Sequence, residues 1–418
     1  MLSIKSFDPS KITLLQICLA AIALRVIWVL LIPVIPISDS YAYDVFAQNI
    51  WQHGTYGWNA DEPTSYWPVG LSGIYSGFYF LFGHTYTPIV IFNIACSVAI
   101  IIYTKKLCDR FFEHQNIGIY AAIIIALWPT LIFYCSVLAS ELPYLAFLLA
   151  AIYYLSDLKS GFIKQGIIGG ILFAITYYIR PLATIPLFIT IFYLLINHSE
   201  KKLVVFRSII TIGLIVIAVF PWAQRNYSLY DAYVPMSTNS GATFWMGNQP
   251  DTDGGYKELP DYVDGLNEYE RNNTLKAEAL EYIKEEPVEF LVRTTKKFFI
   301  FHLHETIGVT WNKEGIKQRF GDWAILPLKL IGQAYWSLFL LLGLAGLVLH
   351  ILHKGFWTTA FHPFTLIWAA TAGVHAIIVS QDRYHLPIIP MVTAYGAYAL
   401  YYYQSKYYPS KNSQTTSS

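Results

Sequence analysis

Six ionisable side chains stand at the ends of long apolar segments, where charged residues are rarely tolerated. They are Asp39, Asp44, Glu141, Arg180, Arg225 and Arg383. An ionisable group at the centre of a membrane-spanning helix costs about 2.5–3.5 kcal/mol, and less near the interface, so such residues usually pair, bind a ligand or catalyse. The distribution of Lys and Arg along the chain puts all six on one side of a membrane.

Arginine and carboxylate side chains together suit the transfer of a group from a lipid phosphate. The arginine fork matches phosphate oxygens bidentately, and a neighbouring carboxylate can accept the proton of an attacking hydroxyl. A lipid phosphate would lie at this depth, with its chain in the bilayer. These residues therefore predict group transfer from a phospholipid-like donor to a hydroxyl acceptor.

Simpler roles exist for some of these residues. Asp39 is flanked by two serines, and Ser and Asp commonly cap the N-terminus of a helix. Glu141 and Arg180 could pair with each other and hold two helical hairpins together. Capping does not explain why residues 34–85 contain neither Lys nor Arg, so a catalytic loop is the interpretation that we follow.

The composition is that of an integral membrane protein. Of the 418 residues, 55% are hydrophobic and 13% are charged, against roughly 25% charged in soluble domains. Aromatic residues reach 17%, and such rings favour membrane interfaces. The net charge of +1 gives no reason to expect nucleic-acid binding.

The apolar segments predict an all-α polytopic membrane protein. A spanning helix needs about 20 mostly apolar residues. About ten segments qualify: 12–33, 86–104, 117–135, 138–156, 163–180, 181–197, 203–222, 328–351, 360–379 and 386–403. The fifth and sixth abut at Arg180-Pro181. Because proline cannot continue the preceding helix without losing a hydrogen bond, we expect a tight hairpin there.

The orientation follows from the positive charges of the short loops, which favour the cytoplasm. With the N-terminus inside, the cytoplasmic side carries Lys5, Lys11, Lys105, Lys106, Arg110, Lys159, Lys164, Lys201, Lys202, Arg207, Lys354, Lys406 and Lys411. The short outer loops carry only Arg180 and Arg383. We therefore predict a multi-pass protein of the cytoplasmic (inner) membrane with both termini in the cytoplasm.

Two outer segments are long enough to build a site. The expected organisation is 1–222 for seven helices with the catalytic loop 34–85, 223–327 for a mostly helical outer domain, 328–403 for three helices, and 404–418 for a cytoplasmic tail. We expect loop helices over roughly 40–53 and 68–82, around a polar turn at 57–63. In the outer domain we expect a charged helix over roughly 264–285 and an amphipathic surface helix over 287–302.

No metal motif is evident. The cysteines form no paired motif, so we expect neither a disulfide framework nor a zinc site. His302 and His304 with Glu305 could bind a metal, but histidines on an aromatic-rich segment are more often packing or surface residues. Hard cations take carboxylate oxygens, so a divalent cation at Asp39 and Glu141 stays open. The cysteines are Cys18, Cys96, Cys108 and Cys135.

Several short motifs follow one another along nearly the whole chain. They are Asp39 with Tyr43 and Ala47, Tyr66-Trp67-Pro68-Val69-Gly70, Phe80-Leu81-Phe82-Gly83, Ser140-Glu141, Ile179-Arg180-Pro181, Pro221-Trp222-Ala223-Gln224-Arg225-Asn226-Tyr227, Gly247-Asn248-Gln249-Pro250, and Arg383-Tyr384-His385-Leu386-Pro387 with Pro390. In this order they resemble the C-type membrane glycosyltransferases. The resemblance is to the family 39, dolichyl-phosphate-mannose protein mannosyltransferase-like enzymes of bacteria, which include the aminoarabinose lipid A transferases.

The resemblance implies a C-type fold, a polyprenyl-phosphate sugar donor and inverting transfer, outside the cytoplasmic membrane, to a hydroxyl of a glycan, lipid or protein. It implies Asp39 as catalytic base and Glu141 as supporting acid, with Asp44 as a further catalytic candidate. The implied substrate-binding residues are Arg180, Arg225, Arg383, Tyr384, Tyr43 and Trp67. Trp67 stands where many relatives carry Arg, and Ser40 where the mannosyltransferases carry Glu. The donor sugar, hexose or pentose, and the acceptor are therefore left open.

Two other functions share most of these features. A transporter or flippase for a lipid-linked sugar would also need helices and arginines, but it should place ionisable residues near the middle of the membrane. An oligosaccharide polymerase would work outside with paired arginines and take a lipid-linked acceptor. The one-sided charges and the outer domain favour a glycosyltransferase.

Overall fold

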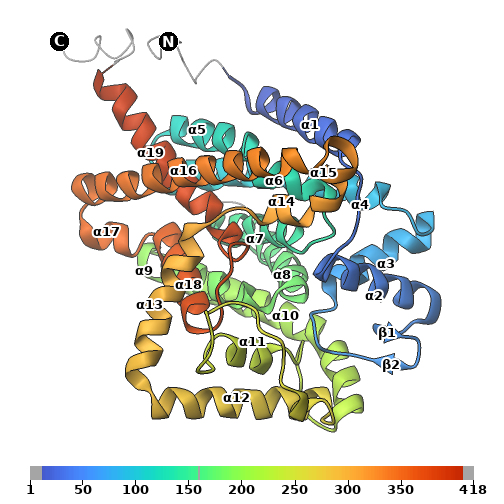
Figure 1. Ribbon diagram of the computed structural model, residues 1–418. Helices are drawn as coiled ribbons and strands as arrows, with labels where there is room; N and C mark the ends of the chain where they lie inside the picture. The colour runs from blue at the N-terminus through green and yellow to red at the C-terminus, as the bar shows by residue number, and fades with distance from the viewer. Residues whose placement is uncertain (1–11, 159–160, 408–418) are drawn as a thin grey trace, which may run out of the picture.

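The computed structural model describes residues 12–158 and 161–407, and most of them are helical (Figure 1). In these residues the strands are β1 (Gly57–Asn59) and β2 (Glu62–Pro63), which pair antiparallel. Of the positive charges that set the orientation, Lys5, Lys11, Lys159 and Lys411 lie outside the described residues. So does the predicted tail beyond Tyr407.

All ten predicted apolar segments are helical. They form α1 (Leu14–Leu31), α4 (Thr87–Phe111), α5 (Gln115–Ala126), α6 (Pro129–Phe133), α7 (Glu141–Ser156), α8 (Phe162–Ile179), α9 (Thr184–Asn197), α10 (Lys201–Tyr230), α16 (Ile325–Lys354), α18 (Pro363–Ile377) and α19 (Ile389–Tyr407). Among the described residues, however, only 4 helices are long and apolar enough to span a membrane, or 5 with one bent pair. The count of ten spans is therefore not confirmed.

Prolines account for part of this difference. The segment predicted at 117–135 breaks into α5 and a second piece that begins at Pro129, and the two are bent by 57°. Proline removes a helical hydrogen bond and kinks or ends a helix. At Arg180 the chain leaves α8 in an extended conformation and restarts at Pro181. The break is where we expected it, but α9 packs against α18 while α8 packs against α7 and α10, so no tight hairpin forms.

The first outer loop has the predicted elements. They are α2 (Asp39–His53), the β1–β2 hairpin and α3 (Gly70–Phe82). The outer domain contains α11 (Ser240–Met246), α12 (Glu268–Glu285), α13 (Pro287–Leu303), α14 (Ile307–Trp311) and α15 (Lys313–Phe320). It begins later than predicted, because α10 continues through Pro221 to Tyr230.

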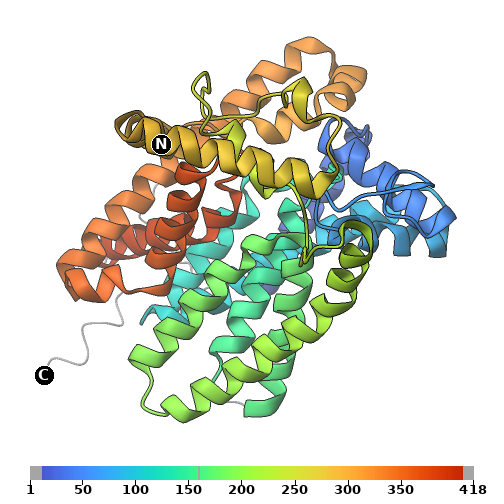
Figure 2. The same cartoon turned by 90° about the horizontal axis from the view of Figure 1, so that it is seen from below.

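The outer domain covers one end of the helical bundle. Figure 1 shows α12 lying across this end and α13 running from it alongside α18, a pair that is in contact. Figure 2 shows α8 and α10 side by side, with α12 crossing above their upper ends in this view. Helix α13 leaves Val288, Leu291 and Phe299 exposed and buries Lys297 and Phe301. It is thus amphipathic, as expected, and its place on a membrane surface stays a prediction.

The bundle core is densest where α16 and α19 cross. A Cβ added to Gly346 would lie 1.8 Å from the carbonyl oxygen of Tyr395. Small residues let membrane helices approach closely enough for backbones to touch. This contact fixes α19 and, with it, the residues that precede α19 at the outer end of the bundle.

Candidate active site

Two ion pairs bring four distant segments together. Asp39 begins α2, and its Oδ2 accepts a hydrogen bond from Nη1 of Arg383 at 2.6 Å. Glu141 begins α7, and its Oε1 accepts one from Nη2 of Arg180 at 2.5 Å. The structure thus places all four of these predicted residues at helix ends or in loops on the same face.

Asp39 is not held in place as a cap. The N-cap position of α2 is Ser38, and no side-chain capping hydrogen bond is present there. Ser38 has φ 52°, which only a few per cent of non-glycine residues adopt. Strain of this kind costs of order 1–3 kcal/mol and concentrates at functional sites. The backbone turn therefore serves to aim Asp39, whose carboxylate reaches Arg383.

Tyr43 lies between the two pairs. It follows Asp39 by one helical turn and shares its face of α2. Burial raises the pKa of Tyr43, and the charges of Asp39, Arg180, Glu141 and Arg383 all act on its hydroxyl. The phenol therefore stays neutral near pH 7 and can donate a hydrogen bond into the site.

Aromatic rings line the arginines. The guanidinium of Arg383 lies 5.0 Å from the ring of Trp311 and 5.3 Å from that of Tyr384. Arg180 lies 5.6 Å from the ring of Tyr144. Such cation–π contacts hold a guanidinium in place without using its N–H donors, which stay available to a ligand.

Several polar atoms in the site are buried and lack a partner among the described residues. They include Oε2 of Glu141, Nε of Arg383 and the hydroxyl of Tyr134. A buried polar group without a partner costs about 1–3 kcal/mol. These atoms can therefore bond a polar ligand or water.

The segment that carries Arg383 is anchored to the outer domain on both sides. Its hydrogen bonds run from Ser380 N to Gly254 O at 2.9 Å, from Thr306 Oγ1 to Asp382 Oδ2 at 3.0 Å, and from His385 Nδ1 to Phe301 O at 3.1 Å. A change in the outer domain should therefore reach Arg383 directly.

Lys297 holds the start of this segment. Its fully buried Nζ bonds the carbonyls of Ile377 and Ile378, at the end of α18, at 2.9 and 3.2 Å. It also bonds Gly247 O at 2.8 Å and Asn248 Oδ1 at 3.1 Å. The motif noticed at Gly247-Asn248 is thus part of a junction between α11, α13 and α18. Burial lowers the pKa of Lys297 to about 7.

Asp44 is separate from the two ion pairs in its contacts. It is buried and accepts hydrogen bonds from the hydroxyls of Tyr79 at 2.5 Å and Tyr86 at 2.9 Å. Gln48 and His84 lie 3.2 and 3.1 Å from its carboxylate. A carboxylate with so many partners fixes α2 to α3, which favours a structural role, and the catalytic role of Asp44 stays a prediction.

Arg225 is bonded to several groups of the first outer loop. Its Nη1 donates to Thr64 O at 2.7 Å and to Ser65 Oγ at 2.8 Å. Its guanidinium stacks on Trp222 at 4.5 Å. The structure joins it to the outer loop and not to Arg180 or Arg383, so we interpret Arg225 as a structural link.

Trp67 belongs to an aromatic cluster of the first outer loop. Its ring centroid lies 5.7 Å from Phe46, 6.2 Å from Trp58 and 4.8 Å from Tyr66. Trp67 contacts neither ion pair through these rings.

Sequence reasoning missed the residues that hold the arginines. Ser140 Oγ accepts from Nε of Arg180 at 2.8 Å. Tyr144 was detectable, since it follows Glu141 by three residues and shares its helix face. Trp311 and Tyr134 reach the site only through the tertiary fold, and the sequence carries no local signal for them.

The described parts of the chain contain no cluster of metal-ligating side chains. No group of 3 or more His, Cys, Asp and Glu side chains there could hold a metal ion. Asp39 and Glu141 each face an arginine. His302 accepts from Trp368, and Glu305 accepts from Trp128 at 2.7 Å. Both carboxylates are already paired with an arginine, and a divalent cation at Asp39 and Glu141 stays a prediction.

The comparisons with known proteins bear on the fold and on the family resemblance, and not on the roles of single residues. The family model for dolichyl-phosphate-mannose-protein mannosyltransferase matches residues 68–223. The structure is similar to the crystal structure of the Archaeoglobus fulgidus oligosaccharyltransferase in the apo form, with a TM-score of 0.58 and 13% identity over 95% of this chain. The chain has the C-type glycosyltransferase fold. The resemblance inferred from the motifs is confirmed at this level.

Two further structures share the C-type fold. One is archaeal AglB from Archaeoglobus fulgidus in complex with an inhibitory peptide and a dolichol-phosphate, with TM-score 0.55, 13% identity and 94% of this chain covered. The other is ArnT from Cupriavidus metallidurans bound to undecaprenyl phosphate, with TM-score 0.58, 10% identity and 92% covered. This chain spans 51%, 50% and 59% of the three solved chains. No curated protein sequence matches it significantly.

Proposed function

We propose that this protein transfers a sugar from a polyprenyl-phosphate donor to a hydroxyl acceptor. The observation that carries the proposal is the pairing of Asp39 with Arg383 beside that of Glu141 with Arg180. Two carboxylates and two arginines supply a base and a phosphate site within one cluster. The solved neighbours with bound dolichol-phosphate and undecaprenyl phosphate support the class of donor.

Donor binding would release the base. The donor phosphate competes with Asp39 for Arg383, since both are anions that the guanidinium can bind bidentately. Nε of Arg383, which lacks a partner among the described residues, gives the phosphate a second donor. Once the phosphate takes the guanidinium, the carboxylate of Asp39 is freed to bind the acceptor hydroxyl.

Transfer then follows in one displacement. Asp39 takes the proton of the acceptor hydroxyl, whose oxygen attacks the anomeric carbon on the face opposite to the phosphate. The bond from that carbon to the phosphate oxygen breaks, and polyprenyl phosphate leaves with the electron pair. Arg180 and Arg383 stabilise the charge on the leaving phosphate. The phosphate is already anionic, so no strong acid is needed, and Glu141 serves to position Arg180.

Two depressions near the site suit a lipid donor. A small crevice, with a volume of about 20 Å³, reaches Arg180 between α9 and α18, and it is lined by Leu182, Ile185 and Val374. An apolar groove of about 570 Å³ runs between α3, α8 and α10 and includes Gly73, Ile175 and Leu214. The groove ends at Ile179, next to Arg180. We place the isoprenoid chain of the donor in this groove.

The finer parts of the proposal concern the sugar and the location. We propose a hexosyl- or pentosyltransferase of the cytoplasmic membrane, with the site on the outer face and both termini in the cytoplasm. The lipids of that membrane surround it, and the acceptor is a glycan, lipid or protein hydroxyl. A divalent cation is not required in this scheme, because the arginines supply the positive charge.

The deciding experiment is single-turnover sugar transfer from a defined polyprenyl-phosphate donor by Asp39→Asn. Asn keeps the shape of Asp and caps helices about equally well, but it cannot act as a base. We expect a folded enzyme with transfer reduced by roughly 10²–10⁴-fold. Asp44→Asn is the matched control, and its effect should appear in thermal melting more than in transfer. Near-normal transfer by folded Asp39→Asn would remove Asp39 as the base.

A further inference from the structure

A second pocket lies at the end of the bundle opposite to the candidate active site. It has a volume of about 340 Å³ and is formed where α4, α9 and α16 end, with α17 (Phe356–Ala360) and α19 completing its wall. The active-site residues, in contrast, lie where helices begin: Glu141 is the first residue of α7, Arg180 precedes α9, and Arg383 precedes α19. At about 1.5 Å per residue, Ile389 to Tyr402 of α19 spans about 20 Å. The two sites therefore lie at opposite ends of the bundle, about 20 Å apart along α19.

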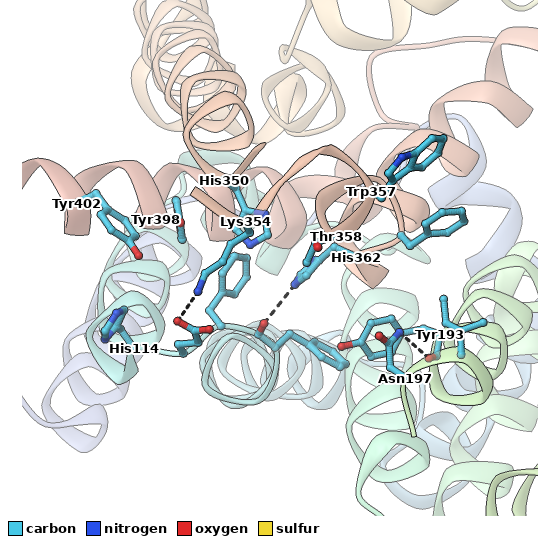
Figure 3. Close-up of a pocket in the computed structure, with 15 residues that line it drawn as sticks. His114, Tyr193, Asn197, His350, Lys354, Trp357, Thr358, His362, Tyr398 and Tyr402 are labelled. Atoms are coloured by element: carbon cyan, nitrogen blue, oxygen red, sulfur yellow. Dashed lines mark hydrogen bonds and ion pairs between the residues drawn. The ribbon is translucent and has the colours of Figure 1, made fainter. Parts of the chain in front are cut away.

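The pocket carries one charge of each sign. Lys354 Nζ lies 2.6 Å from Oε2 of Glu113, and Figure 3 shows the lysine reaching down to this carboxylate. The side chain of Glu113 is 66% exposed. Exposed ion pairs contribute only about 0–1 kcal/mol, so a ligand that offers an anion to Lys354 and a cation to Glu113 can separate them at little cost.

His350 adds an acceptor beside Glu113. Its Nδ1 lies 2.7 Å from Oγ1 of Thr359. The Thr359 hydroxyl already donates to Gly355 O at 3.0 Å, so it must accept from Nδ1. Nε2 of His350 is then a lone-pair acceptor, and no other described group bonds it. His362 is neutral too, since its Nδ1 accepts a hydrogen bond from Phe364 N at 3.3 Å.

Aromatic and apolar side chains surround the charged pair. Tyr398, Tyr402 and Phe112 line one side, and aromatic faces attract a cationic group. At the rim, Ile196, Trp357 and Phe361 are 48%, 70% and 40% exposed. Exposed Trp and Phe at helix ends are typical of the membrane interface. The rim therefore meets lipid, and the interior accepts a small zwitterion.

We infer that this pocket binds the headgroup of a phospholipid with a primary amine, its ammonium on Glu113 and His350 and its phosphate on Lys354. A primary ammonium supplies the N–H donors that both acceptors require, whereas a quaternary ammonium supplies none. An anionic headgroup without an amine would leave Glu113 facing a phosphate. The inference does not depend on sugar transfer at the other end of the molecule.

The test is native mass spectrometry of the purified protein with phosphatidylethanolamine, phosphatidylcholine or phosphatidylglycerol of identical acyl chains. We expect phosphatidylethanolamine to be retained at least about tenfold better than the other two, which corresponds to one charge-assisted hydrogen bond. Equal retention of phosphatidylcholine would overturn the role of the primary amine. Equal retention of phosphatidylglycerol would overturn the role of Glu113.

Matched variants localise the effect. Glu113→Gln and Lys354→Met should each reduce retention of phosphatidylethanolamine, while Glu200→Gln and Lys202→Met should not. The last two residues are exposed and lie at the same end of the bundle, outside the pocket. If all four variants retained the lipid equally, the pocket assignment would be wrong. A last measurement compares soluble phosphoethanolamine with the lipid. If the soluble compound raised the melting temperature as much as phosphatidylethanolamine does, the ligand would not have to be a lipid, and that part of the inference would be wrong.

Discussion

At the scale of single residues, Arg383 and Arg225 differ in the hydrogen-bond partners that they have in the structure. Arg383 has one hydrogen bond to Asp39 and an Nε without a partner among the described residues. Arg225 donates to Thr64 and Ser65 and stacks on Trp222. The partner of Arg383 is a carboxylate that a donor phosphate can replace, whereas Arg225 is bonded to backbone and hydroxyl oxygens of the first outer loop, although both residues stand in arginine motifs of similar appearance.

Arg383→Lys tests this difference. The charge is kept, but a lysine is a point donor and cannot bind a phosphate as a planar fork. We expect a fall of roughly 10²–10³-fold in kcat/KM, the usual cost of removing a preorganised donor. Arg225→Lys is the comparison: it should lower the melting temperature while leaving the KM for the donor unchanged. Wild-type donor kinetics for Arg383→Lys would refute the phosphate role.

The same residues show where prediction from the sequence stops. Asp39, Glu141, Arg180 and Arg383 could be named because ionisable groups are rare beside apolar segments. Their pairing could not, since Asp39 and Arg383 are 344 residues apart. The contacts of Asp44 could not be predicted either, because its partners, Tyr79 and Tyr86, are aromatic residues that the composition explains equally well as interface anchors.

At the scale of elements, helix periodicity and proline positions were sufficient for most of the architecture. The loop helices, the outer helices and the break at Pro181 lie close to where the sequence puts them. The bend at Pro129 and the continuation of α10 through Pro221 were missed, because a proline can end a helix or be accommodated within it. Packing against neighbouring helices decides between these outcomes.

The junction at Lys297 makes a prediction about pH. Lys297→Met should destabilise the protein, since the carbonyls at the end of α18 lose their donor. Burial, followed by the charge of Arg293, lowers the pKa of Lys297 from 10.5 to about 7 in the folded state. Between these values the unfolded chain binds the extra proton, so wild-type stability rises with pH and that of the variant does not. The deficit of the variant in thermal melting should therefore grow from pH 7 to pH 10. A shrinking deficit would contradict the lowered pKa.

The apolar groove makes a prediction about the donor chain. Gly73 lines the groove and Gly77 does not, yet a Cβ at either glycine would meet nothing within 4 Å. Gly73→Trp should fill the groove and raise the KM for a long polyprenyl donor about tenfold, or ~1.4 kcal/mol. A donor with a single isoprene unit should be unaffected, and Gly77→Trp should behave as wild type with both. Equal effects of the two substitutions would place the chain elsewhere.

At the scale of the whole molecule, the two ends differ in charge and in chemistry. The end with the outer domain carries the two ion pairs, and the other end carries Lys105, Lys106 and Lys354. A reporter inserted near Asp264 should therefore read as external, and one fused after Ser410 as cytoplasmic. Measured in intact cells, the reverse result at both positions would move the site to the cytoplasmic face. It would also put the pocket at Lys354 in the outer leaflet.

The pairing of Asp39 with Arg383 also bears on biosynthesis. Synthesis proceeds at about 5–20 residues per second, so roughly 17–70 s separate the emergence of Asp39 from that of a partner 344 residues later. During that time Asp39 has been synthesised but Arg383 has not. A partly made chain therefore lacks the ion pair between them. Under the proposed function, the nascent protein would be inert towards lipid-linked sugars until α19 is made, which would protect the donor from half-finished copies.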